Sequence, residues 1–114
     1  MTQDTPSQLS WDAENTHPEL IEPLKEALRT VMDPEIGLNV IELGLIRNVV
    51  IEEDQAVVTM IMTTPFCPYA PALLEMARQK SEAALGRSTK MAMGMQSWEP
   101  SMMEEGAGAA WGFF

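Results

Sequence analysis

The amino-acid sequence predicts a small single-domain α+β fold, ordered helix, strand, strand, helix, strand, with the helices packed on a short mixed sheet. Three observations support this prediction. Apolar residues between Leu20 and Val31 recur at helical spacing. Two runs rich in Val, Ile, Met and Thr flank a polar turn, as in a β-hairpin. A second helical pattern then precedes a stretch of alternating residues, and 114 residues suffice for one such two-layer domain.

The first helix follows a polar segment. Residues 1–16 lack a periodic apolar pattern, so we expect a flexible lead-in there, with Trp11 available to dock on the domain or on a partner. Two helix starts compete. A capping box from Thr16 would leave Pro23 inside the helix, whereas a start close to Pro23 avoids this conflict and is favoured. Pro34 then predicts a helix end near Met32.

The remaining elements follow in order along the predicted domain, which spans residues 17–100. Residues 34–44 predict a structured loop with one helical turn. Residues 46–51 and 56–64 predict the hairpin, residues 68–85 the second helix with Gly86 as its terminator, and residues 90–97 the third strand. Met91, Met93 and Met95 alternate, as on an inward strand face; a Cu(I) thioether patch is the alternative interpretation. Residues 101–114 predict a C-terminal tail that ends in Trp111, Phe113 and Phe114.

The charge balance limits the partners. Seventeen acidic and seven basic residues give a formal net charge of −10, which repels phosphate backbones, so we expect no nucleic-acid partner. No stretch approaches the ~20 apolar residues of a membrane span, so we expect no membrane partner either. The polar N-terminal residues do not resemble a signal peptide, which predicts a cytoplasmic protein.

Cys67 is the only cysteine, so it cannot form an internal disulfide. It follows a predicted strand and precedes Pro68, a residue suited to the first helical position, which places the thiol at or next to a helix N-cap. The positive end of the helix dipole there favours a thiolate that attacks electrophiles or binds metals. A small buried hydrophobe is the structural alternative.

Other catalytic and metal chemistries have weaker support. His17, the only histidine, lies next to the predicted lead-in, so a Cys/His nucleophilic pair lacks an anchored base. One cysteine and one histidine do not supply the four ligands of a structural zinc site. Asp33 and Glu35 flank Pro34 and are equally typical of turn acids, and Thr63 and Thr64 of strand residues.

Two motifs resemble those of the SufT/PaaD-like iron–sulfur cluster assembly family. Residues 33–46, which begin Asp33-Pro34-Glu35, resemble its first signature, and residues 59–68, which include Thr63-Thr64-Pro65-Phe66-Cys67-Pro68, resemble its second. The similarity spans about residues 20–100. Two departures stand out: Glu42 replaces the family's usual Asp, and residues 101–114 lack the cysteines of PaaD proteins, which favours a general SufT-like role.

The resemblance implies an accessory factor, not an enzyme, that helps to mature iron–sulfur clusters or deliver them to client apoproteins. By position, Cys67 would contact the metal or cluster, and Asp33, Glu35 and Thr64 would line the same pocket. Clusters are held mainly by four thiolates, so one Cys per chain predicts a transiently held cluster completed by a homodimer, an assembly partner or a small thiol. The alternative function is an adaptor that recruits clients without binding a cluster.

Overall fold

The computed structural model describes residues 11–34, 36–63, 68–99 and 102–103 of the chain. Three helices and three strands lie in these ranges: α1 (Asp12–Thr16), α2 (Pro18–Leu28), β1 (Ile46–Ile51), β2 (Gln55–Met60), α3 (Ala70–Leu85) and β3 (Ser88–Met93). The predicted order of helix, strand, strand, helix and strand is confirmed, with the short helix α1 in addition.

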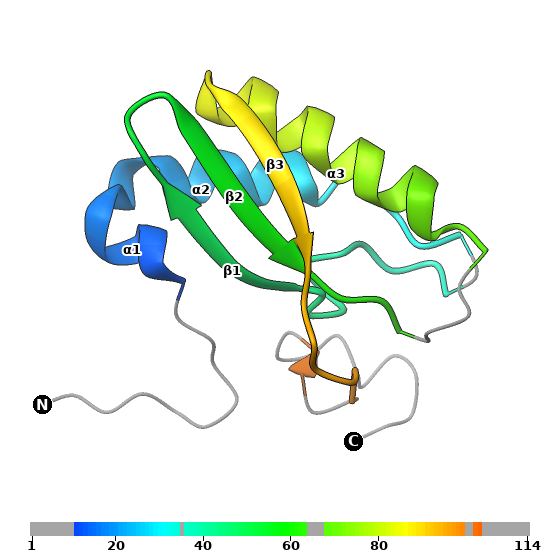
Figure 1. The fold of residues 1–114 in the computed structure, drawn as a ribbon. Coiled ribbons are helices and arrows are strands. Elements are labelled where there is room, and N and C mark those ends of the chain that lie inside the picture. The colour runs from blue at the N-terminus through cyan, green and yellow to red at the C-terminus, as the bar shows by residue number, and fades with distance from the viewer. Residues whose placement is uncertain (1–10, 35, 64–67, 100–101, 104–114) are drawn as a thin grey trace, which may run out of the picture.

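The three strands form one mixed sheet, as predicted. β2 lies in the centre, antiparallel to β1 and parallel to β3. The parallel pair requires a crossover, which α3 provides. Figure 1 shows α2 and α3 running in opposite directions behind the sheet, while α1 lies beside β1. The molecule is therefore a layer of two helices on one face of a three-stranded sheet.

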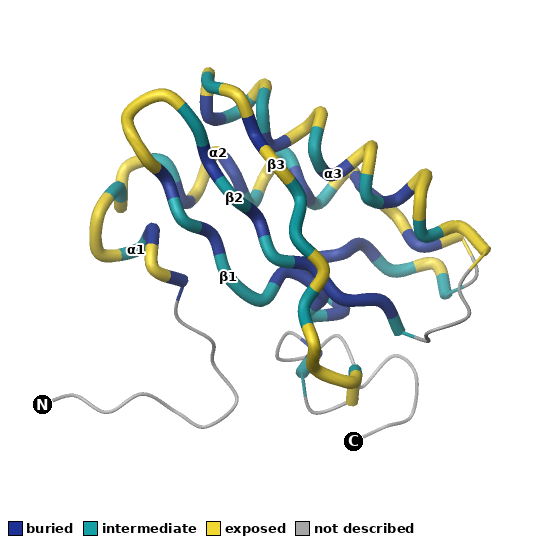
Figure 2. Tube along the Cα trace, viewed as in Figure 1, coloured by how far each residue is buried: buried dark blue, intermediate teal, exposed yellow. Residues whose placement is uncertain are grey.

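The core lies between these two layers. Alternate strand residues are buried, among them Val49, Ala56 and Val58, and they meet the buried faces of α2 and α3. Figure 2 shows this alternation of buried and partly exposed positions along β1 and β2. A period of two is what a sheet with one covered face requires.

The first predicted helix differs from its observed form at both ends. It begins at Pro18, not near Pro23, and it ends at Leu28, not near Met32. Pro23 lies on the exposed side of α2, where water can bind the carbonyl that a proline leaves without a helical donor. Ile21, in the turn before Pro23, is buried on the same side as Leu24 and Leu28, and its burial favours the earlier start at Pro18.

The predicted lead-in is wrong for residues 11–16, whereas residues 1–10 lie outside the described residues. Trp11 is 5% exposed, and its indole N–H donates to the carbonyl oxygen of Ile46 at 3.1 Å. The Asp12 backbone N–H and carboxylate both bind the side chain of Asn48. Lys25 Nζ lies 5.5 Å from the centroid of the Trp11 ring. Trp11 thus joins α1, α2 and the edge of β1. Helix α1 was not predicted, because Trp11 is a single aromatic residue without a periodic apolar pattern around it.

The second helix agrees with its prediction at its C-terminal end. α3 ends at Leu85, and Gly86 caps it with a left-handed φ of 68°. The turn after α3 is hydrogen-bonded to its surroundings. Glu82 accepts a hydrogen bond from the backbone N–H of Thr89, and Arg87 donates one to the carbonyl of Glu52 in the hairpin turn. These bonds fix where β3 begins.

The third strand and the segment after it differ from their predictions. β3 covers Ser88–Met93, and Met93 and Met95 are 53% and 97% exposed, so the inward-facing interpretation is wrong for both. The predicted tail is wrong at its start, because Met103 is 4% exposed and joins the core. We call residues 98–99 and 102–103 the strap; residues 104–114 lie outside the described residues.

Gly44 is the point where the strap meets the domain. A Cβ atom at this position would lie 1.9 Å from the carbonyl oxygen of Met102, and Gly44 has a φ of +72°. Only glycine permits both this backbone conformation and such a close approach. The described ranges contain no helix long and apolar enough to cross a membrane.

We expect Trp11→Ala to lower the free energy of unfolding by roughly 3–5 kcal/mol, the usual cost of truncating a buried Trp. Urea unfolding followed by circular dichroism measures this change. Deletion of residues 1–10 alone is the control and should leave stability nearly unchanged. A chain that tolerates Trp11→Ala without loss of stability would contradict the anchoring role of Trp11.

We expect Gly44→Ala to destabilise the protein more than Gly86→Ala does. Both glycines have similar positive φ values, but the Gly86 position is open, whereas the Gly44 position meets Met102. Backbone strain alone costs about 1–2 kcal/mol at either site. Urea unfolding measures the loss of unfolding free energy in each variant, and the larger loss in Gly44→Ala is the cost of the clash with Met102. Equal losses in the two variants would show that the strap moves aside freely.

Candidate functional site

The residues proposed from the sequence belong to two segments of the chain, the loop after α2 and the connection between β2 and α3. Figure 1 shows the end of α2, the end of β2 and the start of α3 at this end. Asp33 follows α2, and residues 64–67 connect β2 to α3. Glu35, Thr64 and Cys67 lie outside the described residues, so the structure describes Asp33 alone among the four. The described elements that flank these two segments belong to this end of the molecule.

Asp33 is 1% exposed and begins a tight loop. Its backbone N–H donates to Leu38 at 2.9 Å, and its carbonyl accepts the N–H of Gly37 at 2.7 Å. Its carboxylate Oδ1 accepts the N–H of Ile36 at 3.3 Å. Gly37 has a φ of 85°, the left-handed conformation that closes such a loop. The backbone therefore fixes the Asp33 carboxylate in the interior, where a charged group is costly without hydrogen bonds.

Asn39 and Glu42 shape the second half of the first motif. The Asn39 side chain accepts the N–H groups of Ile41 and Glu42, and Glu42 Oε1 accepts the N–H of Asn39 in return. This is the reciprocal geometry of a capping box. It starts a single turn closed by the hydrogen bond from Leu43 N–H to the Asn39 carbonyl, which confirms the expected helical turn. The capping role of Asn39 and Glu42 was not predicted, although the spacing Asn-x-x-Glu is its signal in the sequence.

Backbone hydrogen bonds connect this turn to the strand that leads to Cys67. Leu45 N–H donates to Val40, and Ile61 N–H donates to the carbonyl of Leu45 at 2.8 Å. Ile61 directly follows β2, so the first motif is tied to the second near the start of the segment that carries Thr64 and Cys67.

The strap supports the same turn from the other side. The Trp98 indole N–H donates to the Leu43 carbonyl at 2.7 Å, and Arg47 donates to the carbonyl of Gly44 and to the side chain of Gln96. Arg47 is the extra residue at an irregularity between Ile46 and Asn48, which aims its side chain out of the regular ladder. Partial burial lowers the pKa of the Arg47 guanidinium. No local pattern in the sequence indicates these contacts.

The predicted N-cap position of Cys67 is wrong. The N-cap of α3 is Tyr69, with Ala70 as the first helical residue and Pro71 in the first turn. Pro71 suits this later start, because a proline in the first turn removes no helical hydrogen bond. The helix dipole acts mainly within the first turn, so the argument for a dipole-stabilised thiolate at Cys67 loses its basis.

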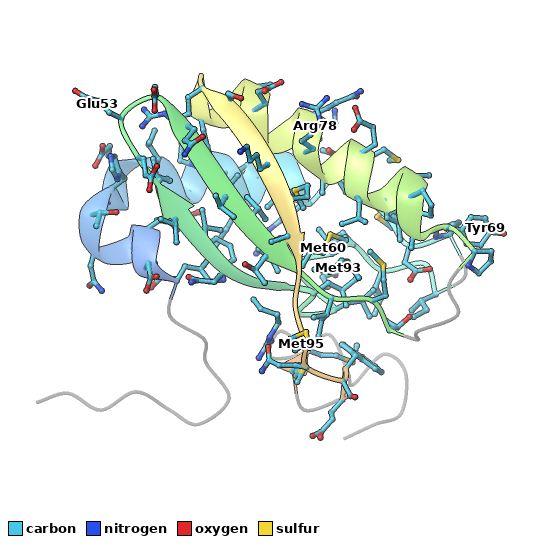
Figure 3. The ribbon with its side chains drawn as sticks, in the orientation of Figure 1. Glu53, Met60, Tyr69, Arg78, Met93 and Met95 are labelled. Carbon is cyan, nitrogen blue, oxygen red and sulfur yellow. The ribbon has the colours of Figure 1, made fainter. Side chains whose placement is uncertain are left out.

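Apolar side chains flank the candidate site. Met32, which precedes Asp33, is 44% exposed, and Tyr69, which follows the segment containing Cys67, is 41% exposed. Figure 3 shows Tyr69 projecting from the start of α3 at this end. Exposed Met and Tyr are typical of surfaces that contact other proteins. Within the described ranges, no three His, Cys, Asp or Glu side chains lie close enough together to hold a metal ion.

Comparisons with known proteins agree with this geometry. A family model described as "Iron-sulfur cluster assembly protein" matches residues 22–92, which contain most of α2, both motifs and most of β3. An "Fe-S protein maturation auxiliary factor" of Porphyromonas gingivalis is 42% identical over 95 residues, covering 81% of this chain and 90% of the relative.

Two solved structures share the fold. A "Domain of Unknown Function DUF59" from Bacillus anthracis has a TM-score of 0.75 at 25% identity and covers 88% of this chain and 98% of its own. The conserved hypothetical protein TM0487 of Thermotoga maritima has a TM-score of 0.60 at 33% identity, with 80% and 92% covered. The family match includes both motifs, and the relative is covered almost completely. The resemblance noted in the sequence is thereby confirmed, and the chain belongs to the iron–sulfur cluster assembly protein family.

Proposed function

We propose that this protein is an accessory factor that assembles iron–sulfur clusters or delivers them to client apoproteins, without turnover chemistry of its own. The observation that carries the proposal is the family match over residues 22–92, because that range contains both motifs. The name of the Porphyromonas gingivalis relative, a maturation auxiliary factor, supports the same role.

Cys67 is the proposed cluster-contacting thiol, and Asp33, Glu35 and Thr64 are the proposed lining of its pocket. The buried, backbone-fixed carboxylate of Asp33 supports this assignment, because it belongs to the end of the molecule where β2 leads into the segment carrying Cys67. A carboxylate that is fixed before the cargo arrives needs little reorganisation when it binds.

Ligand counting favours a carrier over permanent storage. Iron–sulfur clusters are held by four ligands, and each chain has one cysteine. The remaining ligands would come from a second copy, an assembly partner, a client or a small thiol. Exposed Met32 and Tyr69 beside the site would contact such a partner. A cluster held by few protein ligands is released easily, which suits delivery to an apoprotein.

We expect Cys67→Ser to abolish most iron and sulfide retention after anaerobic reconstitution and to fail to restore iron–sulfur enzymes in cells that lack the wild-type protein. The measurements are iron and sulfide content per chain and client activity, with circular dichroism to confirm the fold. If Cys67→Ser matures clients normally, Cys67 does not handle the cluster and the adaptor function is the better interpretation.

We expect Asp33→Asn to weaken client maturation with a smaller effect on iron content, because Asn retains the acceptor for the Ile36 N–H but removes the charge. Asp54→Asn is the matched control, since Asp54 is exposed in the hairpin turn. The same reconstitution and client assays apply. Equal behaviour of the two variants would exclude a role for the Asp33 charge.

A further inference from the structure

The sheet has one face that no described helix covers. α2 and α3 lie behind the sheet in Figure 1, so the opposite face is open in the described part of the chain. Strand register places eight side chains together there, and we call them the open face: Asn48, Val50, Gln55, Val57, Thr59, Ser88, Lys90 and Ala92, of which Asn48, at the edge, binds Asp12 of α1. Val50 pairs with Val57, and Thr59 pairs with Ala92, so the centre of this face is apolar.

The open face is too small for a stable dimer but fits a short peptide. Three strands of six residues span about 20 Å by about 14 Å, at ~3.3 Å per residue and ~4.8 Å between strands. The resulting area of about 300 Å² is well below the ~800 Å² that each partner buries in a typical stable interface. One extended segment of a few large apolar residues covers a face of this size.

The chain itself carries such a segment. Residues 104–114 follow Met103, which is buried, and Met102 contacts Gly44 shortly before β1 begins. Residues 104–110 are Glu-Glu-Gly-Ala-Gly-Ala-Ala, and seven residues reach up to about 23 Å, which is the length of the open face. Beyond this linker the sequence is Trp111-Gly112-Phe113-Phe114.

Charge and tethering favour the same occupant. Lys90 is exposed beside Val57, where it can pair with Glu104 or Glu105 or lie over the face of an indole ring. Two segments of one chain joined by few residues meet at an effective concentration in the millimolar range, so even a weak contact between them is populated. We propose that residues 111–114 of the same chain pack on the open face, with Trp111 and Phe113 against Val50, Val57 and Ala92.

Acrylamide quenching of Trp111 fluorescence tests the proposal in the full chain. The Trp111 contribution is the difference between the unmodified chain and Trp111→Phe, and N-acetyltryptophanamide is the exposed reference. We expect Trp111 to be quenched several-fold less than the reference. Val57→Asp, which places a charge at the centre of the open face, should make Trp111 as quenchable as the reference. Ala72→Asp, which places a charge on the exposed side of α3 behind the sheet, is the control and should preserve the protection.

Three results would overturn the proposal. The first is a Trp111 that is fully quenchable in the unmodified chain, and the second is protection that survives Val57→Asp in a folded protein. The third is protection that grows with protein concentration together with a dimer mass in sedimentation, which would identify a second copy as the occupant.

A measurement that leaves the sheet intact covers the case in which Val57→Asp does not fold. Serine replaces Trp111, Phe113 and Phe114 together, and amide NMR spectra of the two full-length chains are compared. We expect shifts concentrated at Val50, Val57 and Ala92. Unchanged amides at these positions would exclude the packing of residues 111–114 on the open face.

Discussion

The hydrogen bond from Ile61 N–H to the Leu45 carbonyl is the contact on which the candidate site depends. It joins the end of the first motif to the residue after β2, and so sets where the chain to Cys67 begins. Leu45 is fully buried and also donates to Val40, so its carbonyl is held in one position by packing and by its own hydrogen bond. Two motifs that are distant in sequence thereby become neighbours through backbone atoms, which side-chain substitutions do not remove.

Sequence patterns predicted the fold correctly where the residues of an element showed one clear periodicity. The hairpin, whose second strand ends at Met60 instead of the predicted residue 64, the C-terminal end of α3 at Gly86 and the mixed sheet fall into this class. Local rules failed where tertiary packing decided. Pro23 marks a helix start by propensity, yet α2 begins at Pro18, where the buried Ile21 continues the apolar side formed by Leu24 and Leu28. Met93 and Met95 follow an inward pattern, but the strand ends at Met93 and both side chains are exposed.

The candidate site was predictable in part for the same reason. The motifs indicated Asp33 and Cys67, but the sequence held no evidence that Trp98 and Met102 return to the turn at Leu43 and Gly44. Such contacts depend on which distant segments meet, and no local period encodes them. The position of the hairpin turn relative to the site also depends on the tertiary fold. Glu53, in that turn, and Tyr69, beside the site, lie at opposite ends of the molecule (Figure 3). The hairpin turn therefore holds the charge of Glu53 away from the candidate site.

The position of the strap in the sequence has a consequence for biosynthesis. The turn around Gly44 leaves the ribosome well before Trp98 and Met103, which complete its packing. At roughly 5–20 residues per second, the nascent chain carries this turn without its cover for several seconds. β3 must also emerge before the parallel pair with β2 can form. The first motif thus reaches its final environment only when translation has passed Met103, so an incomplete chain lacks the backbone support that the finished domain gives its candidate site.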